Sequence, residues 1–315
     1  MTPAAAARNA VDGVLLLDKP RGLTSQQAVS RAKRLFNARK AGHTGTLDPL
    51  ADGLLPIGFG EATKFSQFLL DADKRYLATL RLGVVTTTGD AEGEIIKELP
   101  VAVTLSQIIA VLPRFVGPQQ QIPPMHAAIK VDGKPLYAYA RAGVTVVREP
   151  RSIIISDIQL IDFIDKNIKL RISCSKGTYI RVLAENIGTA LGCGAHLTAL
   201  TREAAGGLDL ANTVSMGDLE AMTLRQRLER LLPADTFAVG LTRFDVTAED
   251  ERLLFTGQRV RAAAVAGLCR LYGPSGAFFG IGEVVAGTLV ARRLLTQPLP
   301  AVPGQNGLSH PVVTG

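Results

Sequence analysis

The stretch NIKLRISC, residues 167–174, alternates polar and apolar side chains over the length of a typical strand. Such alternation predicts a β-strand with one buried face, because successive side chains of a strand point to opposite faces of its sheet. A helix is expected to follow from about Tyr179 to Gly192. Its packed side would carry Val182, Leu183 and Ile187. The fold must therefore contain a sheet with one covered face in which this strand is followed directly by a helix.

Two more strands and two more helices are predicted nearer the N-terminus. Residues 13–19, GVLLLDK, form an apolar strand that runs into a Lys-Pro-Arg-Gly turn, and residues 75–83, RYLATLRLG, form another. One helix follows Thr24, which stands three residues before Gln27 as in a capping box. The other, TLSQIIAVLPRFVG, is also capped. Its apolar side would be formed by Leu105, Ile108, Ile109 and Leu112.

The pattern changes twice along the chain. Residues 119–150 are broken by prolines and glycines and carry tyrosines that look exposed, which predicts a protruding or mobile insertion. Residues 207–240 look helical and connecting. From 242 to 298 a short helix, capped by Thr247 and closed at Gly257, is followed by strands broken by turns, as in a small β-rich domain. The expected organisation is a loose N-terminus (1–10), a main domain (11–240), the β-rich domain (242–298) and a fraying tail (299–315).

Composition limits the class of protein. The 315 residues are 47% hydrophobic and 20% charged, which is the balance of a folded chain with a sizeable core. Lys and Arg exceed Asp and Glu by 35 to 28, an excess that favours a polyanionic partner without identifying it. No run approaches the roughly 18 apolar residues of a spanning helix, and the N-terminus does not resemble a secretory signal. We therefore expect a cytoplasmic protein with no membrane partner.

The cysteines and histidines do not indicate a metal site. Cys174, Cys193 and Cys269 are widely spaced, so buried thiols are expected and no disulfide framework is visible. Cys193 and His196 form the only close pair of metal-ligand type, which is too few ligands for zinc.

The stretch GHTGTLDPLADGLLP, residues 42–56, allows two interpretations. Asp48 precedes Pro49, so it could cap a short helix that has proline at its first position and that closes at Asp52 and Gly53. Asp48 could instead be catalytic, but spacing alone favours the cap. A basic run lies just before this stretch, and a solvated helix face is its ordinary explanation. It consists of Arg31, Lys33, Arg34, Arg39 and Lys40.

Taken with LLLDKPRGLTS, DKRYLATLRLG, CSKGTYIR and LGCGAHLTALTR, the longer stretch GHTGTLDPLADGLLPIGFGEATKF resembles the tRNA pseudouridine-55 synthases of the bacterial TruB family. The resemblance covers residues 11–205 and weakens after 207, where the final segment is similar to a PUA-type RNA-binding domain. It implies an α/β (α+β) pseudouridine synthase fold with a mixed, mainly antiparallel sheet, followed by a small β-rich PUA-like domain.

The resemblance also implies an activity: isomerisation of uridine to pseudouridine at position 55 in the T-loop of tRNA, after the base is flipped out, without cofactor or metal. The essential aspartate of the family falls on Asp48, a carboxylate able to attack the uridine and later leave. Whether it attacks the base or the ribose stays open. The implied partner is the T-arm of tRNA, and we expect a monomer. The basic run and the insertion would contact the RNA.

Other site residues follow from the same motifs. Arg181 corresponds to the arginine that pairs with the catalytic carboxylate and favours its charged form. His43 would help to displace the base, although a turn residue is the ordinary explanation, and Tyr76 would stack on the flipped uracil, although it could be a core aromatic. The remaining positions are Tyr179 and Leu200 for uridine contact and Lys19 with Pro20 as a supporting turn.

One motif departs from the family pattern. Where the chain has MHAAIK, the family often has tyrosine or histidine followed by serine, so the contacts of His126 and Ala127 are not carried over. Two other functions compete. The chain could be a non-catalytic RNA-binding or RNA-folding protein on the same scaffold. It could also be a metal-dependent nuclease or phosphoryl-transfer enzyme built on Asp48 and Asp52, although further clustered acidic ligands are missing.

Overall fold

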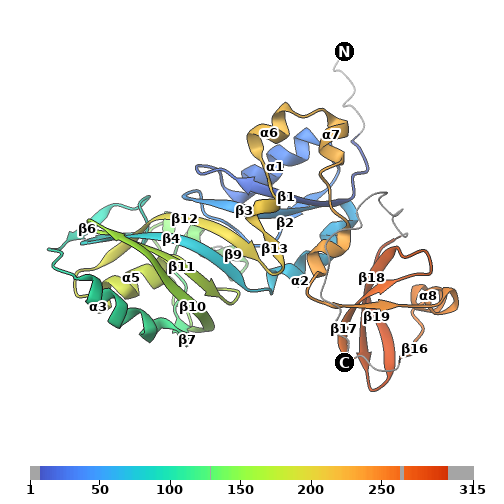
Figure 1. Ribbon diagram of the computed structural model, residues 1–315. Coiled ribbons are helices and arrows are strands. Elements are labelled where there is room, and N and C mark those ends of the chain that lie inside the picture. The colour runs from blue at the N-terminus through green and yellow to red at the C-terminus, as the bar shows by residue number, and fades with distance from the viewer. Residues whose placement is uncertain (1–7, 128, 263–265, 297–315) are drawn as a thin grey trace, which may run out of the picture.

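The computed structural model describes residues 8–127, 129–262 and 266–296. A long, twisted sheet runs through the larger part of the molecule (Figure 1). Its main path is β14 (Val214–Ser215), β1 (Gly13–Lys19), β3 (Ala51–Phe59), β12 (Ala195–Ala205), β4 (Lys74–Leu82), β11 (Asn167–Cys174), β10 (Arg151–Ile164) and β7 (Gly117–Gln121). Two short strands extend it, β2 (Ala41–His43) beside β3 and β13 (Leu208–Asp209) beside β12. Only β1–β14 and β3–β12 are parallel pairs, which confirms the mixed, mainly antiparallel sheet.

The helices cover the two halves of this sheet separately (Figure 1). Near β1 and β3 lie α1 (Ser25–Leu35), α6 (Met216–Ala221) and α7 (Leu224–Leu228), and near β11 and β10 lie α3 (Leu105–Val111) and α5 (Ile180–Ala190). Both predicted capping boxes are confirmed, Thr24 with Gln27 and Thr104 with Gln107. The apolar side predicted for α3 is partly wrong, because Leu105 and Ile109 are exposed while Val111 is buried. A 3-10 turn, η2 (Leu112–Phe115), ends the helical pattern at Pro113, so the packed side shifts.

The alternation in β11 is confirmed by burial. Its apolar side chains are at most 1% exposed, whereas its polar ones lie on the open face of the sheet. In β1 both faces are covered: Leu15 and Leu17 join the cluster under α1 and α5, while Val14 and Leu16 join a second cluster on the other face. That second cluster involves η1 (Gly60–Phe65), α2 (Ser66–Leu70) and η4 (Ala234–Ala238).

The predicted insertion starts later than expected. Residues 119–121 are the end of β7, hydrogen-bonded to β10 at the edge of the sheet, so the chain leaves the sheet only after Gln121. Beyond it are a short hairpin of β8 (Lys130–Val131) and β9 (Lys134–Pro135), then α4 (Leu136–Arg141). A second hairpin, β5 (Val84–Thr86) with β6 (Ile95–Glu98), lies outside the main sheet. The glutamine-rich sequence of β7 hid the strand, because its single buried side chain leaves little apolar pattern.

Residues 207–240 are only partly helical. They contain β13, η3 (Leu210–Asn212), β14, α6, α7 and η4, and β14 pairs parallel with β1.

The last part of the chain forms a five-stranded sheet in the order β15 (Thr242–Asp245), β17 (Gly267–Tyr272), β18 (Phe278–Val285), β19 (Thr288–Leu294) and β16 (Val260–Arg261). Its helix α8 (Ala248–Phe255) is capped by Thr247 as predicted. Of the predicted loose ends, residues 1–7 and 299–315 lie outside the described residues.

The three cysteines are buried free thiols, as the spacing predicted. Within the described ranges, no helix is long and apolar enough to cross a membrane.

Candidate active site

Asp48 does not cap a helix. The backbone N–H of Ala51 donates to the carbonyl of Asp48 at 3.0 Å, which closes a turn, and β3 begins immediately afterwards. The helical interpretation was therefore wrong, and Asp52 and Gly53 lie inside the strand that it would have ended. Strand pairing explains the difference, because Ala51, Asp52 and Gly53 are held in register by β12. The turn thus presents Asp48 at the start of a central strand.

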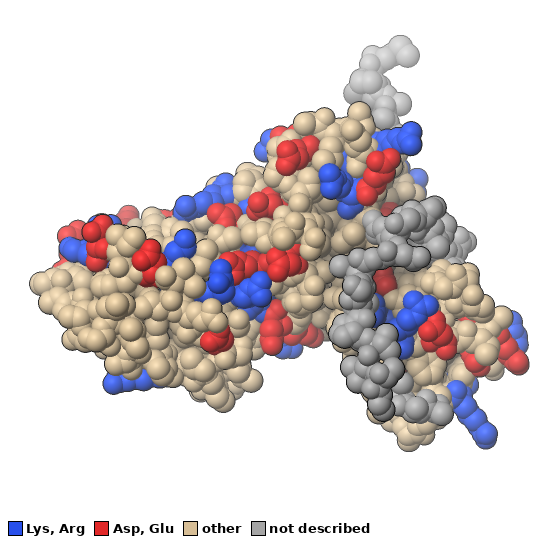
Figure 2. Space-filling model, viewed as in Figure 1, with Lys and Arg blue, Asp and Glu red and all other residues tan. Residues whose placement is uncertain are grey.

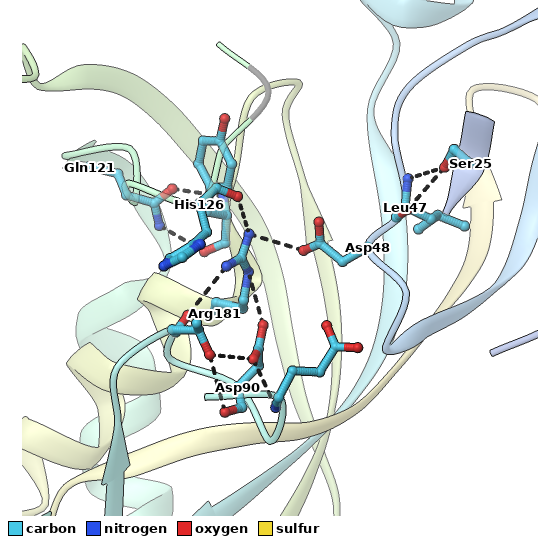
Figure 3. Close-up of polar contacts among 10 residues, drawn as sticks. Ser25, Leu47, Asp48, Asp90, Gln121, His126 and Arg181 are labelled. Carbon is cyan, nitrogen blue, oxygen red and sulfur yellow. Dashed lines mark hydrogen bonds and ion pairs between the residues drawn. The ribbon is translucent and has the colours of Figure 1, made fainter. Parts of the chain in front are cut away.

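Side chains from distant segments hold the backbone of this turn. The hydroxyl of Ser25, at the first position of α1, donates to the carbonyl of Leu47 at 3.0 Å and accepts from its N–H at 2.7 Å (Figure 3). Arg202, which is 1% exposed, donates to the carbonyl of Leu54 at 2.7 Å and to that of Gly45 at 3.2 Å. The backbone on both sides of Asp48 is therefore fixed by buried polar contacts.

Glycine at position 53 is required by this arrangement. Its φ is +96°, and a Cβ would lie 2.6 Å from the carbonyl oxygen of Arg202. A side chain there would push β3 away from β12 next to the turn that carries Asp48.

The structure brings Asp48 and Arg181 together, as the sequence predicted. Nη2 of Arg181 lies 3.1 Å from Oδ2 of Asp48, and the arginine side chain is 6% exposed (Figure 3). The same Nη2 donates to the carbonyl of His126 at 3.1 Å, and Nη1 donates to that of Thr88 at 3.3 Å. Arg181 belongs to the first turn of α5, so the guanidinium is anchored by a helix and by two loops.

Asp90 is a second carboxylate on the same guanidinium, and sequence reasoning missed it. Its Oδ2 lies 3.6 Å from Nε of Arg181, and its side chain is 4% exposed. Its Oδ1 accepts from the hydroxyl of Thr88 and from the backbone N–H of Glu92 (Figure 3). No interpretation was made of TTTGDAEG, because an aspartate after a glycine is a common turn residue. Its burial becomes possible through the guanidinium of Arg181, since a buried carboxylate needs a cation.

Burial raises the pKa of Asp48 above its ordinary value, the Arg181 guanidinium opposes this rise, and the negative charge of Asp90 adds to it. The side chain of Asp48 is nonetheless 38% exposed. A substrate can therefore reach a carboxylate whose far side is held by a buried cation.

Tyr179 is fixed by a residue that the sequence did not identify. It is the N-cap residue of α5, and its N–H donates to Oε1 of Gln121 at 2.7 Å while its carbonyl accepts from Nε2 of Gln121 at 3.0 Å. Gln121 is buried at the end of β7. Because residues 119–121 were assigned to a loop, no signal pointed to this side chain.

Tyr76 and Leu200 lie on neighbouring central strands. Tyr76 is buried on β4 directly opposite Arg202 on β12, and burial raises the pKa of its hydroxyl while Arg202 opposes the rise. Leu200 is paired with Ala51 on one side and Ala78 on the other. Both belong to the core cluster, and their contact with a uridine stays a prediction.

His43 ends β2, and burial lowers the pKa of its imidazole, with Arg202 acting in the same direction. Lys19 is wholly buried at the end of β1 and donates from Nζ to the carbonyls of Pro20 at 2.9 Å and Leu23 at 2.7 Å. Burial lowers its pKa to about 8 although Asp52 and Asp48 oppose this. The lysine thus closes its own turn, in agreement with a supporting role for this pair.

The structure has two cavities, of about 550 Å³ and 640 Å³, and the first adjoins the Lys19–Pro20 turn. The first is lined by Asp18, Lys19 and Asp52 among others, and the second by Arg75, Arg171 and Glu203; Asp48 lines neither. In the described part of the chain, no group of three or more His, Cys, Asp or Glu side chains is placed to hold a metal ion. What the arrangement offers chemically is a partly exposed carboxylate, a buried guanidinium and two nearby phenols.

Family models match most of the chain. Residues 33–180 match the N-terminal domain of the TruB family pseudouridylate synthases, residues 181–237 match the tRNA pseudouridylate synthase B C-terminal domain, and residues 245–295 match the C-terminal region of pseudouridine synthase II TruB.

Similar proteins agree with these models. A tRNA pseudouridine synthase B from Thiobacillus denitrificans is 53% identical over 290 residues, which cover 92% of this chain and 97% of the relative. The protein of that name from Dechloromonas aromatica is 52% identical, with 91% and 96% covered. Among solved structures, a chain of a Cbf5-Nop10-Gar1 complex superposes with a TM-score of 0.69 at 25% identity, covering 91% of this chain and 84% of that one.

Proposed function

The chain belongs to the TruB family of pseudouridylate synthases, and from this premise we propose that it isomerises uridine to pseudouridine in tRNA, at position 55 of the T-loop. In this reaction the bond between ribose C1′ and N1 of uracil breaks, a bond from C1′ to C5 forms, C5 loses its proton and N1 gains one. Atoms and electrons balance within the nucleoside.

Asp48 is the proposed catalytic residue. The observation that carries this assignment is the 3.1 Å ion pair between its carboxylate and the buried guanidinium of Arg181. A carboxylate that attacks the uridine must be ionised and must keep one orientation, and a guanidinium anchored by two carbonyls supports both. Asp90 shares the same guanidinium and helps to hold the cation in place beside Asp48.

The uridine site proposed around Asp48 uses the neighbouring side chains. Tyr76 would stack on the flipped base, and Tyr179 and Leu200 would complete the walls of the site. The charge of Asp48 reaches both phenols and adds to the rise in their pKa, so both tyrosines stay protonated near neutral pH. His43 would occupy the space from which the base is withdrawn. Flipping the base out of its stack costs a few kcal/mol, and stacking and phosphate contacts offset this cost.

The T-arm is the proposed RNA element, and α1 and the insertion after Gln121 are its proposed contacts. In α1, Arg31 is paired with Glu220, so the rest of the basic run is the better candidate for phosphate contacts. We further propose a monomeric, cytoplasmic, metal-independent enzyme with a catalytic unit over 11–240 and a PUA-like unit over 242–298.

Single-turnover release of tritium from tRNA labelled at C5 of uridine tests the activity directly, and pseudouridine mapping in the product tests the position. We expect release with and without a chelator, confined to position 55. RNA binding without release would favour the non-catalytic alternative. Release that is abolished by the chelator would overturn the metal-independent mechanism.

A further inference from the structure

Arg202, on the central strand β12, is 1% exposed although its side chain ends in a cation. Its strand pairs parallel with β3 and antiparallel with β4, which places Gly53 on one side of Arg202 and Tyr76 on the other. A buried cation is ordinarily paired with a carboxylate, because its removal from water is costly. No ion pair within the described ranges includes Arg202.

The arginines on the open face of the same sheet are paired. Arg75 and Arg171 lie 3.3 Å and 2.8 Å from the carboxylate of Glu203. Figure 2 shows cationic and anionic side chains side by side on the surface over the main sheet. Glu203 directly follows Arg202, but consecutive side chains of a strand point to opposite faces, so this carboxylate serves the open face only. The charge of Arg202 therefore stays uncancelled and adds to the effect of burial in lowering the pKa of His43.

The guanidinium of Arg202 joins three segments at the candidate site. Nε donates to the carbonyl of Leu54 at 2.7 Å and Nη2 to that of Gly45 at 3.2 Å, and these carbonyls lie on the two sides of Asp48 in the chain. The third partner is the phenol of Tyr76. Burial raises the pKa of this phenol, and the charge of Arg202 and a hydrogen bond from its side chain both oppose the rise. One buried group thus contacts the Asp48 turn and the ring proposed to stack on the base.

The contact with Tyr76 has a fixed direction. A guanidinium carries five donors and no acceptor, so the phenol oxygen must accept from it, and the O–H of Tyr76 is left free for another acceptor. Lysine could not replace this arginine. A single ammonium nitrogen on a flexible chain cannot span acceptors that lie in three directions, as a planar fork of donors does.

We infer that Arg202 is a positioning residue that couples Tyr76 to the turn of Asp48, so that the ring and the carboxylate keep the separation that the reaction requires. The inference rests on the proposed function, and it concerns a residue that is too enclosed to touch the uridine. A misplacement of about 1 Å caused by a residue away from the reacting atoms can slow an enzyme about a hundredfold. The missing ion pair is then explained, because a carboxylate beside Arg202 would compete with the two carbonyls and the phenol.

Arg202→Lys keeps the charge and removes the three-way contact. With saturating enzyme, we expect the single-turnover rate of tritium release to fall about a hundredfold while the Kd for tRNA changes less than about twofold. The acid limb of the rate profile should not move, because the pKa of Asp48 is governed by burial, Arg181 and Asp90. Arg227→Lys is the matched control.

The control residue has the same chemistry in another place. Arg227 donates from Nε to the carbonyl of Leu219 and from Nη1 to that of Leu35, both at 2.7 Å, and within the described ranges it forms no ion pair. It joins α7 to α6 and α1, and it contacts neither the Asp48 turn nor Tyr76. Arg227→Lys should therefore lower the urea midpoint and leave the single-turnover rate unchanged.

Fluorine NMR reports the coupling without the reaction. The chain has five tyrosines, so labelling with fluorotyrosine gives few resonances, and that of Tyr76 is the one absent from Tyr76→Phe. We expect Arg202→Lys to move the Tyr76 resonance and leave the others in place. If Arg202→Lys prevents folding, Gly45→Ala makes the same test, because its Cβ would press on Nη1 of Arg202 at 3.3 Å. Gly192→Ala is the control for this variant, with the same φ of +79° and nothing within 4 Å.

Three results would overturn the inference: a Tyr76 resonance that stays in place in the folded variants, a rate loss no larger than that of Arg227→Lys, or equal losses in rate and in tRNA affinity. A wild-type protein that binds tRNA but releases no tritium would count against the proposed function. The Tyr76 resonance would then still decide whether Arg202 holds the ring.

Discussion

Nη2 of Arg181 lies 3.1 Å from Oδ2 of Asp48 while its Nε lies 3.6 Å from Oδ2 of Asp90, so one buried guanidinium is shared by two carboxylates of unequal exposure. Asp90 is enclosed and Asp48 opens to the surface. Such sharing separates two tasks, since the enclosed carboxylate anchors the cation and the open one remains available for chemistry.

Replacing Asp48 with asparagine should leave folding and tRNA affinity nearly intact and lower the isomerisation rate at least about a thousandfold, because an amide is a far weaker nucleophile. Burial raises the pKa of Asp48 in the folded protein, so the ionised carboxylate lowers the free energy of unfolding at a pH above that pKa. The neutral amide does not carry this cost, and the variant should melt no earlier than the wild type. Single-turnover tritium release, thermal melting and filter binding measure the three quantities. A near-normal rate in a folded variant would remove Asp48 from catalysis.

The pH dependence should separate the partners of Arg181. The acid limb of the rate profile follows ionisation of Asp48. Because the charge of Asp90 raises the pKa of Asp48, Asp90→Asn should move that limb to lower pH. Arg181→Met removes the opposing cation, so the limb should move to higher pH, with a lower plateau rate. Single-turnover rates from pH 4 to about 8 test both shifts. Shifts in the same direction would show that Asp48 does not control the limb.

The pairing of Asp48 with Arg181 followed from the sequence, and the omissions have a physical pattern. Asp48, Tyr76, Tyr179 and Arg181 stand in long motifs. Asp90 and Gln121 act through the segments that they hold, and each is a single polar residue whose partner is distant in sequence.

The fold shows the same pattern. β11 was recognisable because its burial alternates residue by residue. β3 was mistaken for a helix start because parallel pairing with β12, a contact about 150 residues away, overrides the local preference of an Asp-Pro pair.

The close approach of β3 and β12 should make Gly53 intolerant of substitution. Gly53→Ala would place a Cβ 2.6 Å from the carbonyl of Arg202 at φ +96°, so we expect a loss of several kcal/mol, above the roughly 1 kcal/mol of backbone strain alone, together with loss of activity. Gly257→Ala is the matched control, with φ +78° and nothing within 4 Å of the added atom. Urea unfolding of both variants measures the difference; equal losses would refute the steric argument.

Thr44 offers a prediction in which stability should rise. Its hydroxyl is buried without a hydrogen-bond partner among the described residues, four positions before Asp48, and the residue is 2% exposed. A buried hydroxyl left unpaired costs about 1–3 kcal/mol, and valine has nearly the same shape without that group. Thr44→Val should therefore raise the free energy of unfolding by about 1 kcal/mol. Thr63→Val is the control, because the hydroxyl of Thr63 donates to the carbonyl of Gly60 at 2.7 Å and its removal should destabilise the protein. Urea unfolding curves of the two variants should move in opposite directions, and a destabilised Thr44→Val would show that the hydroxyl has a partner in solution.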